Sequence, residues 1–81
     1  MSVGQFIKEK RLDVGMLQKE LAQACDVSVQ TINTIERGKS TPSITTLRRI
    51  AQVIGVDYFQ LRILLKGGDL HNGKDNQSST Q

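Results

Sequence analysis

Residues 18–37 read QKELAQACDVSVQTINTIER, and this stretch decides the fold. Apolar residues recur at helical spacing in two sets: Leu21, Ala22 and Cys25, then Val27, Ile32 and Ile35. Each set lines one face of a short helix, and the few residues between them leave room only for a turn. Ala22 is small enough to let the two helices cross closely. The stretch therefore predicts two packed helices joined by a tight turn.

The outer face of the second helix is polar and almost uncharged: Gln30, Thr31, Asn33 and Thr34. Ser28 precedes this helix, where its hydroxyl can accept a backbone N–H of the first turn. Solvated helix faces are usually rich in Lys and Glu. Taken alone, the face is an ordinary polar surface.

A wider pattern surrounds the two helices. Its members are Ile7-x-x-x-Arg11 before them, and Ile35-Glu36-Arg37-Gly38-Lys39, Pro42-Ser43, Leu47, Ile50-Ala51 and Ile54-Gly55-Val56 after them. In this order and spacing the chain resembles the helix-turn-helix domain of the lambda-repressor/Cro-like (XRE) DNA-binding regulators over residues 3–65. The resemblance implies an all-α, compact five-helix domain that binds double-stranded DNA.

The same resemblance assigns roles to the polar residues. In the motif the second helix enters the major groove, where amides and methyl groups can meet base edges. The expected base contacts are Ser28, Val29, Gln30, Asn33 and Thr34. The expected phosphate contacts, which set register without reading sequence, are Gln18, Arg37, Lys39, Ser40 and Thr41.

Arg11 shares an apolar helix face with Val3, Ile7 and Val14. An unpaired buried charge is costly, so Arg11 needs a partner. The resemblance implies that this partner is Glu36. We interpret both residues as a structural ion pair in preference to DNA contacts.

Two positions depart from the family pattern. Leu17 stands where a capping Ser or Thr is usual, and Asp26 stands where Gly is usual. The second departure predicts a positive φ at Asp26, which Asp tolerates with some strain. Cys25 is interpreted as a small core residue, because no second cluster of metal ligands accompanies it.

The full pattern predicts five helices, over residues 3–14, 18–25, 29–37, 44–54 and 58–66. Residues 1–66 form the domain. Residues 67–81, GGDLHNGKDNQSSTQ, have the composition of a disordered polar tail.

The last predicted helix, YFQLRILLK, is apolar on more than one face. A small monomer can bury only one face of a terminal helix, so the excess favours a dimer interface. The expected contributors are Phe59, Ile63, Leu64 and Leu65. The alternative is a core helix that is wrapped tightly by its own chain.

Charge and composition limit the function. Residues 1–66 carry ten Lys/Arg and six Asp/Glu, a net charge of 10 − 6 = +4, and the remainder carries 1 − 2 = −1. The basic domain is compatible with a polyanionic partner. The chain lacks a membrane-spanning apolar run and a signal peptide, and its single Cys fits a reducing compartment, so we expect a cytoplasmic protein.

No catalytic constellation is present, so we expect no enzyme activity, no metal and no cofactor. The predicted function is a transcriptional regulator, most often a repressor in this family, acting as a homodimer on a near-palindromic operator. The alternative is an antitoxin or protein-interaction module, with the last helix facing a partner such as a toxin.

Overall fold

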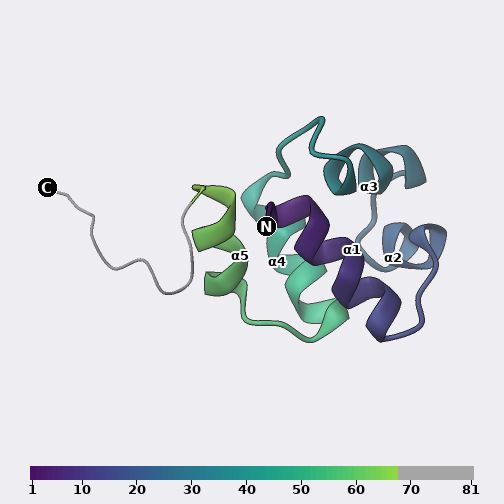
Figure 1. Ribbon diagram of the computed structural model, residues 1–81. Helices are drawn as coiled ribbons and strands as arrows, with labels where there is room; N and C mark the ends of the chain where they lie inside the picture. The colour runs from purple at the N-terminus through teal and green to yellow at the C-terminus, as the bar shows by residue number, and fades with distance from the viewer. Residues whose placement is uncertain (68–81) are drawn as a thin grey trace, which may run out of the picture.

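The computed structural model describes residues 1–67, and within that range the chain forms helices and no strand (Figure 1). The five helices are α1 (Val3–Asp13), α2 (Gln18–Ala24), α3 (Val29–Glu36), α4 (Ile44–Ile54) and α5 (Tyr58–Leu65). The predicted all-α, five-helix architecture is confirmed. Helices 1, 2, 3 and 5 each end one residue earlier than predicted.

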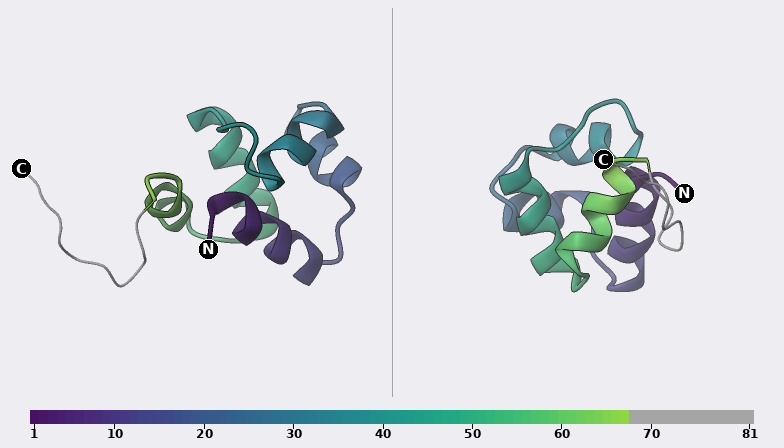
Figure 2. Two further views of the ribbon diagram at one scale, coloured as in Figure 1. Left: turned by 45° about the horizontal axis from the view of Figure 1, so that its top comes forward. Right: turned by 90° about the vertical axis from the view of Figure 1, so that its left-hand side faces the viewer.

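The helix α1 lies at the centre of the arrangement, in contact with α3, α4 and α5. The pair α2–α3 packs at one end and α5 at the other, as Figure 1 and the left view of Figure 2 show. The start of α3 therefore lies away from α5, while Ile35 near the end of α3 and Leu64 of α5 line a common hollow.

One core cluster holds the helices together. Each helix contributes a side chain that is 0 % exposed: Ile7, Leu21, Ile32, Leu47 and Leu61. Burial of such a side chain stabilises the fold by about 1.5–3 kcal/mol. The remaining core residues, including Ala22 and Cys25, fill the space between the helices as their spacing predicted.

Side-chain caps fix four of the five helix starts. The residues Ser2, Ser28, Ser43 and Asp57 each accept a hydrogen bond from a backbone N–H in the first turn. Leu17 has no acceptor to offer, but the Glu20 carboxylate accepts from the Leu17 backbone N–H at 2.8 Å. This reverse bond leaves α2 with half of a capping box.

Two local predictions have different outcomes. Asp26 has a φ of 58°, so its predicted left-handed conformation is confirmed. Val14, which was expected on the buried face of the first helix, is 51 % exposed. The reason is that α1 ends at Asp13, and the chain turns away before Val14 can reach the core.

A close approach that the sequence did not predict joins α1 to the end of α3. Gly4 is buried against the backbone carbonyls of Ile35 and Glu36. A Cβ at this position would lie 2.8 Å from the Glu36 carbonyl oxygen and nearer still to that of Ile35. Only glycine allows the two helices to come this close.

Candidate DNA interface

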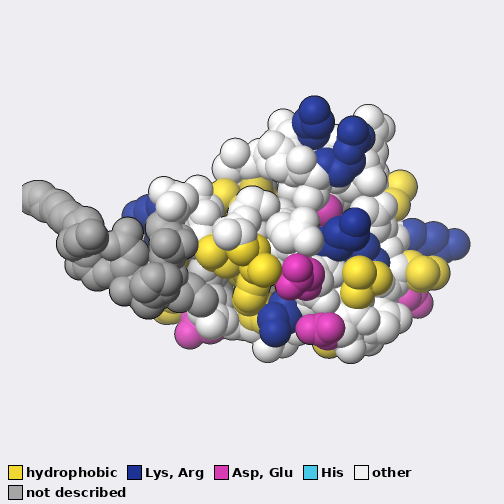
Figure 3. Space-filling view, in the orientation of Figure 1, with side chains coloured by type: hydrophobic (Ala, Val, Ile, Leu, Met, Phe, Trp, Pro, Cys, Tyr) yellow, Lys and Arg dark blue, Asp and Glu magenta, His cyan; other side chains and the backbone are white. Residues whose placement is uncertain are grey.

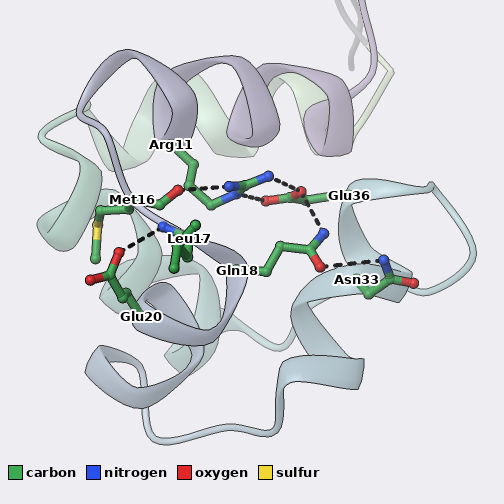
Figure 4. A network of polar contacts seen from close by, with 7 residues as sticks. All are labelled: Arg11, Met16, Leu17, Gln18, Glu20, Asn33 and Glu36. Carbon is green, nitrogen blue, oxygen red and sulfur yellow. Dashed lines mark hydrogen bonds and ion pairs between the residues drawn. The ribbon is translucent and has the colours of Figure 1, made fainter.

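A buried ion pair fixes the C-terminal end of α3. The Arg11 Nε donates to Glu36 Oε2 at 2.7 Å, and Arg11 Nη2 donates to Glu36 Oε1 at 3.0 Å (Figure 4). Both residues are only 6 % exposed. Arg11 Nη1 also donates to the Met16 carbonyl at 2.7 Å. The planar guanidinium thus ties α1, the α1–α2 connection and α3 together.

Gln18 extends this network to α2. Its Nε2 donates to Glu36 Oε1 at 3.0 Å, and its Oε1 accepts from Asn33 Nδ2 at 3.4 Å (Figure 4). A phosphate contact from Gln18 requires a side chain that points outward from α2, whereas the amide turns inward to Glu36 and Asn33. The amide points toward the Glu36 carboxylate because a buried carboxylate oxygen needs hydrogen-bond donors, and the Gln18 Nε2 supplies one.

The α3 residues that were expected to meet bases fall into two groups. Val29 is 48 % exposed and Gln30 is exposed as well, while Ser28 uses its hydroxyl to cap the helix. Asn33 and Thr34 are half-buried. Asn33 donates to Gln18, and the Thr34 hydroxyl lies 3.0 Å from that of Ser40. Both side chains are therefore engaged in hydrogen bonds within the domain. The first turn of α3 is consequently its most accessible part.

The loop after α3 presents its polar residues to solvent. Arg37, Lys39, Ser40 and Thr41 are all exposed. In Figure 3, Lys and Arg side chains gather at the top of the view, over the region of α3 and this loop. The loop thus combines positive charge with hydroxyl donors on one edge of the domain.

A polar hollow lies beside this edge. It is lined by Ser2, Gln5, Lys8, Gln18, Asn33, Glu36, Arg37 and Lys39. Three cations surround the hollow, and its one carboxylate is already neutralised by Arg11. Sequence reasoning missed Gln5 and Lys8, although their three-residue spacing places them on one face of α1.

The turn between α2 and α3 is held from α4. Arg49 Nη1 donates to the Cys25 carbonyl at 3.2 Å. Burial raises the pKa of the Cys25 thiol, and the Arg49 charge opposes this effect. A buried thiol with a raised pKa is a packing residue, not a nucleophile.

Among residues 1–67, no cluster of three His, Cys, Asp or Glu side chains could hold a metal.

The residues expected at the dimer interface do not all reach the surface. Phe59 is 66 % exposed and Ile63 is 41 % exposed, while Leu65 is half-buried. Leu64 is only 9 % exposed and belongs to the core of its own chain, so its assignment to a surface is wrong. The pattern of apolar residues could not reveal which side of α5 faces α1 and α4.

The comparisons with known proteins agree with this geometry. A family model described as helix-turn-helix matches residues 7–61. The chain belongs to the lambda-repressor/Cro-like (XRE) helix-turn-helix family. No helix within residues 1–67 has the length and hydrophobicity that a bilayer crossing requires.

Individual relatives are somewhat more than one-third identical to this chain over the aligned residues. An uncharacterized HTH-type transcriptional regulator of Methanothermobacter thermautotrophicus is 37 % identical over 55 residues, which are 68 % of this chain and 80 % of that protein. The ImmF control region 10 kDa protein of Bacillus phage phi105 is 38 % identical, covering 75 % of this chain and 68 % of the relative. The crystal structure of SinR, the master regulator for biofilm formation, in complex with DNA superposes with a TM-score of 0.69 at 34 % identity, covering 74 % and 97 % of the two chains.

Proposed function

We propose that this protein is a cytoplasmic, sequence-specific transcriptional regulator that binds double-stranded DNA as a homodimer. The carrying observation is the contrast within α3. Its C-terminal end is fixed by the buried Arg11–Glu36 pair, while Val29 and Gln30 at its start remain exposed. A rigidly held helix with a free, polar first turn suits insertion into the major groove.

In the proposed complex, the first turn of α3 reads bases and the surrounding residues hold the DNA backbone. The Gln30 amide can donate and accept together, and Val29 can contact a thymine methyl. Arg37 and Lys39 would bind phosphates, assisted by the hydroxyls of Ser40 and Thr41. Gln18, Asn33 and Thr34 are half-buried, and we propose that they support the interface through the hydrogen bonds described above.

The proposed homodimer would use the exposed side of α5, where Phe59 and Ile63 are four residues apart. Two copies related by a two-fold axis would present their α3 helices to half-sites one helical turn apart, about 34 Å on B-DNA. A near-palindromic operator follows from this symmetry. Regulation of transcription, and repression in particular, would come from occupying that operator.

The test is selection of bound duplexes from a random DNA pool. A near-palindromic consensus, with two half-sites about one helical turn apart, is the expected result. The double variant Val29→Ala/Gln30→Ala should enrich no such consensus, although it keeps the basic loop. If the unchanged chain enriches no consensus either, the proposed function is wrong.

A second candidate function is suggested by the exposed apolar residues of α5. The same surface could face a different protein, such as a toxin, and the chain would then act as an antitoxin. Sedimentation of the isolated protein separates the two, because a mass of twice the chain mass favours the homodimer. A monomer that binds no palindrome would favour the partner-protein role.

A further inference from the structure

A groove runs between α4 and α5, at the end of the molecule away from α3. It is lined by Arg48, Ala51, Gln52, Val56, Tyr58, Phe59 and Arg62. The groove has a volume of about 520 Å³ and is open to solvent along its outer side. None of these residues takes part in the network that holds α3.

Two arginines flank one aromatic ring in this groove. The guanidinium carbon of Arg48 lies 5.1 Å from the centroid of the Tyr58 ring, and that of Arg62 lies 5.9 Å from it. Such cation–π contacts orient a guanidinium without neutralising its charge. The ion pairs among residues 1–67 are Lys10–Asp13 and Arg11–Glu36, so neither groove arginine has a carboxylate partner there.

The rest of the lining is apolar apart from Gln52, and Phe59 is its most exposed apolar member. Phe59 is 66 % exposed, and its ring meets that of Tyr58 edge-on at a centroid distance of 5.5 Å. Ala51 and Val56 complete the apolar part. Exposed aromatic residues beside arginines are the groups that most often dominate the energy of a protein interface.

We propose that this groove docks an acidic, amphipathic peptide segment of another protein. Carboxylates of the segment would accept paired hydrogen bonds from Arg48 and Arg62, and its apolar side chains would cover Phe59 and Val56. DNA fits the groove less well, because its phosphate backbone offers nothing to bury the apolar part. A symmetric second copy fits less well too, because it would bring the same arginines toward each other.

The position of the groove has a regulatory consequence. Phe59 belongs both to the groove and to the exposed face of α5, so a docked segment competes with a second copy for that ring. The first turn of α3 stays free throughout. A partner of this kind would act on the assembly of the protein and leave its DNA-reading helix uncovered.

The experiment uses the ¹⁵N-labelled full chain without DNA and a pair of synthetic peptides. One peptide carries Leu and Phe on one helical face and Glu on the other, and its twin has Lys in place of every Glu. The acidic peptide should shift the amide resonances of Arg48, Tyr58 and Arg62 and leave those of α3 unchanged. The basic twin should leave the groove resonances unchanged.

Charge variants make the test specific. Arg48→Glu should lower the affinity for the acidic peptide at least about tenfold, the loss expected when a hydrogen bond between charged groups is removed. Lys19→Glu on exposed α2 makes the same charge change elsewhere and should leave affinity within about twofold. Arg62→Gln provides a milder second variant, and thermal melting verifies that each variant folds.

Several results would overturn the proposal. They are equal binding of the basic twin, shifts confined to the loop with Arg37 and Lys39, and unchanged affinity in both groove variants. Absence of binding would overturn it as well. Dilution of a homodimer held by Phe59 and Ile63 should move the resonances of those two residues only. If dilution moves the Arg48 resonance as far as the peptide does, a second copy occupies the groove and the peptide assignment is wrong. None of these outcomes bears on DNA binding, which the duplex selection tests separately.

Discussion

At the scale of single residues, Glu36 is the residue through which α3 is hydrogen-bonded to both α1 and α2. Its two oxygens accept from Arg11 and Gln18, which reach it from α1 and α2. The apolar face predicted only that Arg11 needs a partner, and the resemblance to the family implied that this partner is Glu36. The inward turn of Gln18 was missed, because side-chain direction depends on that same buried acceptor.

Replacing Glu36 by Gln should destabilise the fold by about 3–5 kcal/mol, because it leaves the buried Arg11 charge unpaired. Chemical denaturation measures the loss. Asp13→Asn is the matched control, since the Lys10–Asp13 pair is 4.0 Å long and exposed. That change should cost less than about 1 kcal/mol. A Glu36→Gln protein as stable as the control would show that the pair contributes little.

Asp26→Gly should be neutral or stabilise the protein by up to about 1 kcal/mol. Relief of the left-handed conformation at φ 58° offsets the entropy that glycine loses on folding. Asp26→Ala is the companion variant, and it should be less stable than the parent because Ala tolerates this conformation poorly. Urea unfolding of the three proteins gives the order. A glycine variant that is the least stable would mean that the Asp side chain contributes a compensating bond.

Gln30→Ala should cost about 1–3 kcal/mol of binding energy and relax base preference at one position of each half-site. Fluorescence anisotropy on the selected site and its single-base variants measures this. Gln52→Ala removes an exposed amide from α4, away from the proposed interface, and should change nothing. Equal loss of affinity on every duplex would mean that Gln30 contacts the DNA backbone instead of a base.

Lys39→Ala should weaken all duplexes alike, because a phosphate contact carries no base information. The plot of log affinity against log salt should flatten by about one unit per subunit. Titrations at several salt concentrations test this expectation. A variant that changes base preference without changing the salt slope would contradict the phosphate assignment.

At the scale of elements, the contact between α1 and α3 depends on Gly4. Alanine inside a helix is normally more stable than glycine by about 1 kcal/mol. Here a Cβ would collide with the carbonyls of Ile35 and Glu36, so Gly4→Ala should instead destabilise by about 1–3 kcal/mol. Thermal melting is the measurement, with exposed Gln5→Ala as the neighbouring control. An Ala variant that melts higher than the parent would mean that α1 moves away from α3 at no cost.

The elements also show how far sequence reasoning reaches. Apolar spacing identified every helix and the buried residues Leu21, Ile32 and Leu47, because burial of one face imposes that spacing. Val14 was misplaced because periodicity gives the direction of a side chain but not the residue at which the helix stops. The role of Gly4 was missed because the residues next to it in the sequence do not indicate how closely α3 approaches α1.

At the scale of the whole molecule, the exposed side of α5 should determine the assembly. Ile63→Asp places a charge in the proposed apolar interface and should give a monomer in light scattering. Its affinity for the operator should fall steeply, because the two half-sites are then bound singly. Leu64→Asp is unsuitable for this test, since Leu64 is buried and a charge there would destabilise the fold itself. A persistent dimer in the double variant Phe59→Asp/Ile63→Asp would place the interface elsewhere.

The start of the chain lies beside the loop that follows α3. Met1 and Ser2 line a common hollow with Gly38, Ser40 and Thr41. An affinity tag or fluorescent fusion attached at Met1 would therefore emerge next to the residues proposed to follow the DNA backbone. Such a fusion would add its own charge and bulk next to that loop, so the binding experiments above should use a chain with no tag attached at Met1.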